Sequence, residues 1–346
     1  MLKELLGLIG IKSSAHEKLT AKLSVVEAAN EGHPDLEIQS REDEVRTRIL
    51  GSFLGLAIGD AKGMPAESKS PKYADHVADS FDYLSGYLPA GHFTDDTHHA
   101  TFLAESLLEK GDFDAKDFMD KLSNMDVNRG YGPTTMKVVL RYLGGIPYDK
   151  AGLPSPGNGP SMRVAPLALL YHYDLDLLRE YTRASARVTH TAPEAIAGAM
   201  TVSFSIAYML NHFKEKFDKA RFLNELINFI QNESPELAEA LKDNAELMKR
   251  EGCRVLETVP HAIRIFLQDP YDFERAISQA IRGGGDADTI AAIVGAISGA
   301  FNGLDKIPQL WIERLENSPK GRDYIKKLAN DLCMLSRRKA KEKTSS

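Results

Sequence analysis

Glycines recur at four-residue intervals in two apolar segments of this chain. The first segment carries Gly51, Gly55 and Gly59, and Gly63 lies one step beyond. Residues four apart share one face of an α-helix, and a glycine inside a helix costs about 1 kcal/mol relative to alanine. A helix with this stripe is predicted to meet another backbone at close range.

The helix predicted after Asp288 repeats the pattern with Ala291, Gly295, Gly299 and Gly303. We therefore expect the two helices to lie in the core and to pack tightly against each other. The loops at their ends would then be held near one another. Close packing with no catalytic purpose would leave the same stripe, so the pattern alone predicts a fold and not a function.

The rest of the chain also reads as helical. Apolar residues recur with 3.6-residue periodicity, and no sustained alternation of β-branched residues predicts strands. The pattern Ser40-x-x-Asp43 predicts a capping box that opens the first long helix, and Thr191-x-x-Glu194 predicts another. The predicted helices cover 40–59, 95–110, 191–212, 218–231, 235–250, 255–268, 271–282 and 289–303, with a long loop at 144–160. The expected fold is one compact all-α domain of orthogonal helices.

Composition limits the classes of partner. The chain has 346 residues, of which 43% are apolar, which is ample for a core. A net charge of −6 argues against a protein that coats nucleic acid or a membrane surface. The apolar runs at 49–59 and 290–303 are too short to span a bilayer, which needs about 20 residues. Cys253 and Cys333 lack metal-site spacing, so we expect a reducing, cytoplasmic location. The expected state is a monomer.

The ends of the chain differ from its body. Residues 1–39 carry no catalytic pattern and are predicted to be an appendage, helical or partly disordered. Its first residues, MLKELLGLIGIK, favour an amphipathic helix over a signal peptide. The main body is predicted at 40–336. The basic segment 337–346 is expected to be a solvated, frayed tail.

Two acidic motifs precede apolar helices. In the first, Thr94 and Thr97 flank Asp95 and Asp96. An ordinary helix start would favour a threonine cap and acidic residues near the positive end of the helix dipole. Two adjacent carboxylates exceed that need, however, and they repel each other unless a cation neutralises them.

The second motif is the glycine run 283–285 followed by Asp286, Asp288 and Thr289. A glycine loop with a simple helix cap is the plain alternative. Together the motifs offer carboxylate and hydroxyl oxygens, which suit Mg²⁺, Mn²⁺ or Ca²⁺ rather than zinc or copper. If the fold brings them together, they predict a site for two metal ions in a hydrolase.

These motifs and the sequence between them resemble the ADP-ribosylglycohydrolase family. The matching segments are GSFLGLAIGDAKGMPAE (51–67), GHFTDDTHHA (91–100), RGYGPTT (129–135), GNGPSMRVAPLALLY (157–171), ARVTHTAPEAIAGA (186–199) and GGDADTIAAIVGAISGAFNG (284–303). The resemblance implies a compact all-helical fold and two Mg²⁺ or Mn²⁺ ions at its centre. It also implies hydrolysis of the bond between ribose C1″ and an acceptor, with ADP-ribose or an ADP-ribosylated protein as the partner.

The resemblance also implies roles for individual residues. The implied metal ligands are Thr94, Asp95, Asp96, Asp286, Asp288 and Thr289. Catalysis would fall to Glu67, Asp95 and Asp96, and a proton could pass to either Asp95 or Glu67. The implied substrate contacts are Tyr131, Gly157, Asn158, Gly159, Ser161, Met162 and His190.

The loop at 157–163 enters a helix, and helix N-termini bind anions such as a diphosphate. Pro160 lacks the N–H that a small residue would offer there. A simple turn is the plain alternative for this loop.

Near Arg129, the sequence offers Asn128, with Asp126 further back, in place of the acidic residue of the nitrogenase-regulating members, which weakens a prediction of arginine as acceptor. One alternative is a non-catalytic relative of the same fold that binds ADP-ribose or serves structurally. A two-metal phosphoesterase is another.

Overall fold

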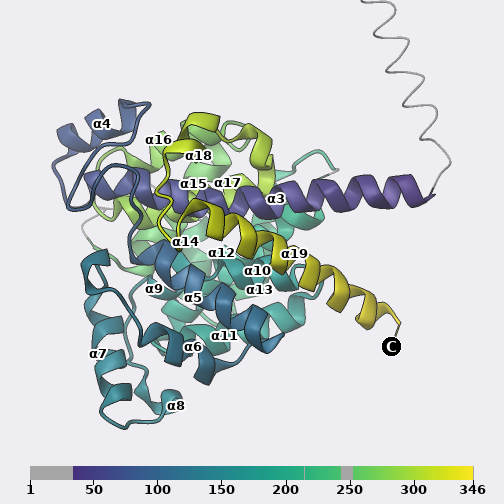
Figure 1. Cartoon of the computed structure of the whole chain (residues 1–346), viewed down its shortest axis with the longest axis horizontal. Coiled ribbons are helices and arrows are strands. Elements are labelled where there is room, and N and C mark those ends of the chain that lie inside the picture. Colours follow the sequence, from purple (N-terminus) through teal and green to yellow (C-terminus); the bar gives the residue numbers. More distant parts are fainter. Residues whose placement is uncertain (1–33, 214, 243–251, 346) are drawn as a thin grey trace, which may run out of the picture. The chain divides into compact units, whose positions relative to one another are not determined.

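A computed structural model describes residues 34–213, 215–242 and 252–345. In these ranges the chain forms α-helices and short 3-10 helices and no β-strand, which confirms the all-α fold (Figure 1). The helices that build the core and the site are α3 (Pro34–Gly63), α5 (Asp95–Lys110), α7 (Pro133–Leu143), α9 (Gly159–Arg163), α10 (Ala165–Tyr171), α11 (Leu175–Arg187), α12 (Pro193–Asn211), α15 (Val255–Gln268), α16 (Phe273–Ile281) and α17 (Ala287–Asn302).

The remaining α-helices and the 3-10 helices lie around them. The α-helices are α4 (Pro71–Asp79), α6 (Ala115–Leu122), α8 (Tyr148–Ala151), α13 (Lys219–Ile230), α14 (Pro235–Lys242), α18 (Gln309–Arg314) and α19 (Arg322–Thr344). The 3-10 helices are η1 (Met64–Ala66), η2 (Val127–Arg129) and η3 (Leu304–Lys306). The chain divides into two units, 1–45 and 46–346, and the site described below lies entirely within the second.

The two glycine stripes meet, as the sequence predicts. A Cβ atom on Gly55 would lie 2.2 Å from the carbonyl oxygen of Gly295, and one on Gly299 would lie 2.0 Å from that of Gly51. The pairing of Gly63 with Ala287 at the other end makes the helices antiparallel. We call this contact between α3 and α17 the glycine seam. It places the C-terminal end of α3 against the N-terminal end of α17.

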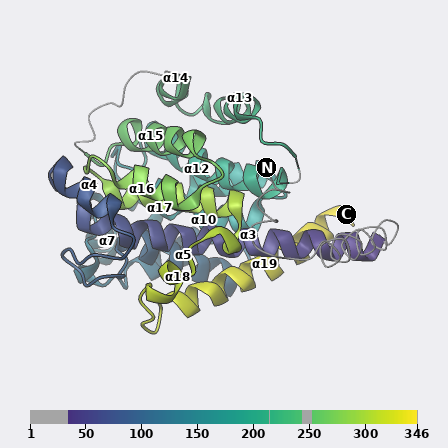
Figure 2. The same cartoon turned by 90° about the horizontal axis from the view of Figure 1, so that it is seen from above.

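Helix α17 is buried along nearly its whole length. On the side away from the glycine seam it contacts α12 and α15, and α16 lies along it (Figure 2). Among the described residues, α12 is the one helix long and apolar enough to cross a membrane, but 89% of its most apolar window is buried in the protein. Its place in the core accounts for that composition.

Most predicted helices are present with small changes at their ends. Helices α5 and α15 have the predicted bounds, and Gly111 ends α5 with a φ of 71°. The prediction of a helix start at Ser40 was wrong, because α3 already begins at Pro34 and runs through the supposed capping box. Thr191 does not cap α12 either, since Ala192 occupies the cap position without a side-chain bond.

The prediction of a frayed basic tail was also wrong. Helix α19 continues to Thr344, and two lysines of its last turns pair with acidic residues. Lys339 lies 3.2 Å from Asp112, and Lys343 lies 2.6 Å from Asp174. The predicted helix at residues 1–12 and the end of the one predicted at 235–250 lie outside the described residues.

Candidate active site

The buried carboxylate of Asp60, in α3, forms hydrogen bonds with the start of α5. Its oxygens accept hydrogen bonds from the Thr94 N–H at 2.9 Å, the Thr97 N–H at 3.0 Å and the Thr97 hydroxyl at 2.6 Å. Burial raises the pKa of Asp60 to about 6, although these bonds oppose the rise. Sequence reasoning missed this residue, whose signal is a lone acid directly after Gly59 in an apolar run.

The two acidic motifs meet at the N-terminal ends of α5 and α17. The hydroxyl of Thr289 donates to both carboxylate oxygens of Asp96, at 3.1 and 3.4 Å. The hydroxyl of Thr94 also donates to Asp96 at 3.3 Å. Residues nearly two hundred positions apart are therefore in direct contact, and both helix dipoles point their positive ends toward the acids.

Glu67 joins this group from the segment that follows α3. The Ser68 N–H donates to the carbonyl of Gly285 at 2.9 Å, which ties Glu67 to the glycine loop before α17. Gly283 to Gly285 all have positive φ values, between 73° and 82°, which favour glycine. One carboxylate oxygen each from Glu67, Asp286 and Asp288 lie within 4.8 Å of one another.

The electrostatics of this cluster explain why it suits a cation. Burial, followed by repulsion from neighbouring acids, raises the pKa of Asp96 and Asp288 well above the ordinary range. Burial and the charges of Asp286 and Asp60 raise the pKa of Glu67 to about 7. Removing so many carboxylates from water is costly unless a positive charge compensates. The donors are all oxygen atoms, so a hard divalent cation fits the residues present.

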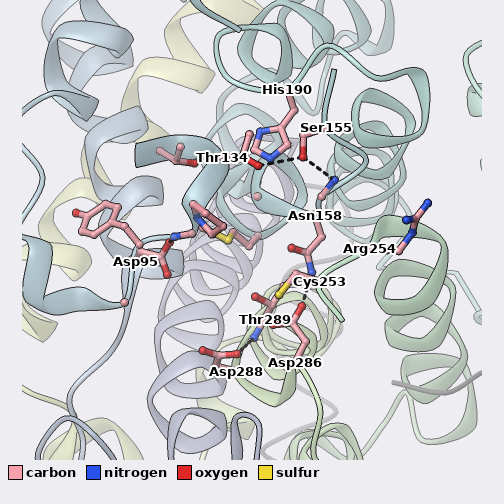
Figure 3. A pocket seen from close by; sticks show the side chains of 18 of the residues that line it. Asp95, Thr134, Ser155, Asn158, His190, Cys253, Arg254, Asp286, Asp288 and Thr289 are labelled. Carbon is pink, nitrogen blue, oxygen red and sulfur yellow. Dashed lines mark hydrogen bonds between the residues drawn. The ribbon is translucent and has the colours of Figure 1, made fainter. Parts of the chain in front are cut away.

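A cavity of about 420 Å³ opens over the acidic cluster (Figure 3). Five of the predicted catalytic or metal-binding residues line it: Glu67, Asp95, Asp286, Asp288 and Thr289. Six of the predicted substrate contacts line it as well: Tyr131, Gly157, Asn158, Gly159, Met162 and His190. The structure thus brings eleven of the predicted site residues around one space.

Three predicted residues have other positions. Thr94 and Asp96 are buried behind the cavity wall, where the hydroxyls of Thr94 and Thr289 both donate to Asp96. The hydroxyl of Ser161 is turned into the core, only 2.7 Å from where a Cβ on Gly198 of α12 would lie. Ser161 therefore shapes the packing of α9 rather than the cavity surface.

Backbone hydrogen bonds fix both sides of the loop at 157–159, which we call the glycine loop from here on. The Leu153 N–H donates to the carbonyl of Thr189 at 3.0 Å, and the Asn158 N–H donates to that of Cys253 at 2.9 Å. The side-chain amide of Asn158 donates to Asp286 and, at 3.1 Å, to the hydroxyl of Thr258. In this structure Asn158 therefore fixes the orientation of an acid of the cluster.

A partly buried ion pair supports the loop on the opposite side of the cavity. Arg129 donates to both carboxylate oxygens of Glu316, which also accepts the Phe93 N–H at 3.2 Å. This pair connects the loop that carries Tyr131 with the segment that leads into the first acidic motif. Sequence reasoning missed Glu316, and no local pattern marks it.

The loop beyond Arg129 reaches the acidic motif directly. The Gly132 N–H donates to Asp95 at 3.3 Å, and the hydroxyl of Tyr131 lies 2.5 Å from Nδ1 of His98. Asp126 is occupied in capping its own turn, where it accepts the Asn128 N–H at 3.1 Å. Cys253 and Arg254 also line the cavity, and sequence reasoning did not select them.

Comparison with known proteins agrees with this geometry. Residues 41–342 match the sequence model of the ADP-ribosylglycohydrolase family. An uncharacterised Archaeoglobus fulgidus protein is 36% identical, with 84% of this chain and 97% of that protein covered. The ADP-ribosylhydrolase ARH3 of Xenopus tropicalis is 28% identical, with 83% and 96% covered.

A solved structure shares the fold. A chain described as an ADP-ribosylglycohydrolase-related protein complex superposes with a TM-score of 0.69 and 34% sequence identity. The alignment covers 85% of this chain and 99% of that one. With the family match spanning the whole site, the conclusion is direct: this chain belongs to the ADP-ribosylglycohydrolase family.

Proposed function

We propose that this protein is a metal-dependent hydrolase that cleaves the ribose C1″ bond of an ADP-ribosylated protein or small acceptor and releases ADP-ribose. The observation that carries the proposal is the convergence of Glu67, Asp286 and Asp288 within 4.8 Å at the cavity. Family membership supports the hydrolysis of ADP-ribose linkages. The Serratia proteamaculans relative is named an ADP-ribosylarginine hydrolase and that of Rhodospirillum rubrum an ADP-ribosyl-[dinitrogen reductase] glycohydrolase.

The acidic cluster and its hydroxyls would hold two Mg²⁺ or Mn²⁺ ions. The residues that would hold them are Thr94, Asp95, Asp96, Asp286, Asp288 and Thr289. When bound, such ions orient ribose hydroxyls and a water molecule and lower the pKa of that water. Thr289 and Asn158 would keep Asp96 and Asp286 in place for this task, since both already bond to them.

Glu67 is the best candidate to move the proton. Within the described residues its carboxylate has no hydrogen-bond partner, and burial, which a bound ion would not remove, raises its pKa above the ordinary range toward the pH at which an acid or base works best. Asp95 is held by the Gly132 N–H instead. As water attacks C1″, Glu67 would accept a proton from it, and the bond to the acceptor would break with its electron pair passing to the acceptor. The proton held by Glu67 would then pass to the departing acceptor, which restores the carboxylate. The surrounding carboxylates would stabilise the oxocarbenium-like transition state.

The other end of the cavity would bind the diphosphate. The glycine loop at 157–159 permits close approach of a ligand to the backbone, and His190 lines the cavity beside it. A protein that only binds ADP-ribose would show no turnover. A phosphoesterase would turn over but would release AMP instead of intact ADP-ribose.

Product analysis tests the proposal. We expect the wild-type protein with Mg²⁺ or Mn²⁺ to release intact ADP-ribose, and Glu67→Gln to slow this about 100-fold or more, the usual contribution of a general acid or base. Calorimetry with ADP-ribose should show that Glu67→Gln still binds it. Release of AMP would instead identify a phosphoesterase, and binding without any turnover would support the non-catalytic alternative.

A further inference from the structure

A guanidinium group lies fully buried behind the glycine loop. Arg163, the last residue of α9, has no exposed surface. Its Nη2 donates to the hydroxyl oxygen of Thr189 at 2.7 Å and to the carbonyl of Ser185 at 3.3 Å. Its Cζ lies 5.2 Å from the ring centre of Phe118. A buried cation that bonds no carboxylate is costly, so this placement calls for an explanation.

The same hydroxyl contacts His190. Oγ1 of Thr189 lies 2.8 Å from Nδ1 of the imidazole. A guanidinium has donors only, so it fills an acceptor position of the Thr189 oxygen. The hydroxyl proton then needs an acceptor in a fully buried place, and within the described residues Nδ1 of His190 is the available one. Thr189 therefore donates to Nδ1, and the ring proton must sit on Nε2.

The glycine loop is shaped to accept this ring. A Cβ on Gly157 would lie 3.2 Å from Nε2, and one on Gly159 would lie 3.0 Å from Cε1 of His190. The imidazole thus stands against the loop with its Nε2 edge at the cavity that His190 lines (Figure 3). No described residue accepts a hydrogen bond from Nε2, so this donor is left for a ligand.

We propose that Arg163 and Thr189 are positioning residues that hold His190 with Nε2–H directed into the cavity, where it donates to a phosphate oxygen of ADP-ribose. The choice of ADP-ribose as the ligand rests on the proposed function. The chain of contacts from Arg163 through Thr189 to His190, which we call the relay, rests on the hydrogen bonds. Burial, together with the charge of Arg163, lowers the pKa of His190 to about 3. The ring therefore stays neutral at physiological pH, and its donor does not depend on protonation of the imidazole.

Nitrogen-15 NMR of the ring nitrogens tests the relay in the ligand-free protein. We expect the wild type to show one tautomer, with a protonated Nε2 and a hydrogen-bonded, unprotonated Nδ1. Thr189→Val removes the hydroxyl at nearly constant volume, so the hydrogen-bond signature at Nδ1 should vanish. Thr189→Ser keeps the hydroxyl and should restore it. Thr182→Val is the matched control, because Thr182 is also buried on that side of the core and bonds Ser203 at 3.1 Å instead.

Calorimetry with ADP-ribose and Mg²⁺ then tests the consequence. We expect binding about tenfold weaker in Thr189→Val, the effect of one misplaced hydrogen bond to a charged group, with Thr189→Ser and Thr182→Val close to wild type. A protonated Nδ1 in the wild type, or unchanged affinity in a folded Thr189→Val protein, would overturn the proposal. Failure of the wild type to bind ADP-ribose would contradict the ligand and the proposed function, whereas the NMR result would still decide the relay.

Discussion

The glycine seam runs along α3 and α17, and the acidic cluster adjoins one end of it, where α17 begins; the two regions solve opposite problems. In the seam, backbone meets backbone: a Cβ on Gly59 would lie 2.0 Å from the carbonyl of Ala291, and the contact needs nothing from outside. In the cluster, carboxylates are buried at distances that raise their own pKa values, as for Asp288. The seam is complete as packed, whereas in our proposal a bound cation completes the acidic cluster. The seam fixes the position of the α17 N-terminus beside the end of α3, and the acids of the cluster lie at that place.

The largest expected effect comes from breaking the seam. In Gly295→Ala the new Cβ would lie 2.0 Å from the carbonyl oxygen of Gly55, so the two helix backbones must separate. We expect a loss of about 3 kcal/mol or more in the free energy of unfolding, measured by urea denaturation, together with loss of activity. Gly132→Ala is the control, because nothing lies within 4 Å of the added atom and φ is −62°. Equal stability of the two variants would contradict the role of the seam.

The next effect separates stability from activity. Asp288→Asn keeps the shape of a buried side chain but removes one of the repelling charges. We expect activity to fall by at least about 100-fold, as for other groups that stabilise transition-state charge, while the metal-free protein becomes more stable. Activity assays and thermal melts in EDTA measure the two quantities.

Asp305→Asn serves as the control for that variant, since Asp305 is exposed in η3 beyond the other end of α17. It should change neither quantity. An Asp288→Asn protein that loses stability in EDTA as well as activity would show that its carboxylate supports the fold rather than a bound ion.

The third expected effect needs no substitution: it is a pH dependence of the stability of the metal-free protein. Folding raises the pKa of Glu67 from 4.5 to about 7 and that of Asp60 from 3.8 to about 6. Between about pH 5 and 7 the folded state therefore binds more protons than the unfolded state, so stability should fall as pH rises. Each extra proton held corresponds to about 1.4 kcal/mol per pH unit.

Bound Mg²⁺ would compensate the carboxylates and should flatten this slope, while raising the melting temperature most at the higher pH. Thermal melts across this pH range, with EDTA and with Mg²⁺, measure the effect. A slope of opposite sign, or one that Mg²⁺ leaves unchanged, would contradict this view of the cluster.

Much of the fold could be predicted because helices are recognisable from the spacing of residues close together in the sequence. The four-residue glycine period marks a helix face whatever the partner, and the apolar periodicity of 255–268 records burial directly. The capping box predicted at Ser40 failed because the same residue types also occur inside helices, and α3 runs straight through. The basic tail pairs with Asp112 and Asp174 instead of fraying, and only the tertiary structure brings these two acids near it.

In the site, too, local sequence predicted some residues, whereas others depend on tertiary contacts. Spacing and resemblance selected the acids and the glycine loop, but not the groups that orient them. Asp60 bonds Thr94 and Thr97 across two helices, and Asn158 bonds Asp286 across more than a hundred residues. Such partners are chosen by three-dimensional packing, so a single sequence carries little trace of them. Ser161 illustrates the converse, since its place in the loop did not decide which way its hydroxyl points.

Release of free ADP-ribose is the most direct test of the central claim that the acidic cluster needs a cation to act. The substrates would span arginine-linked, serine-linked, polymeric and O-acetyl ADP-ribose, each with Mg²⁺, with Mn²⁺ and with EDTA. We expect metal-dependent release from one of these substrates and none from any of them in EDTA. Full release in excess chelator would contradict the claim.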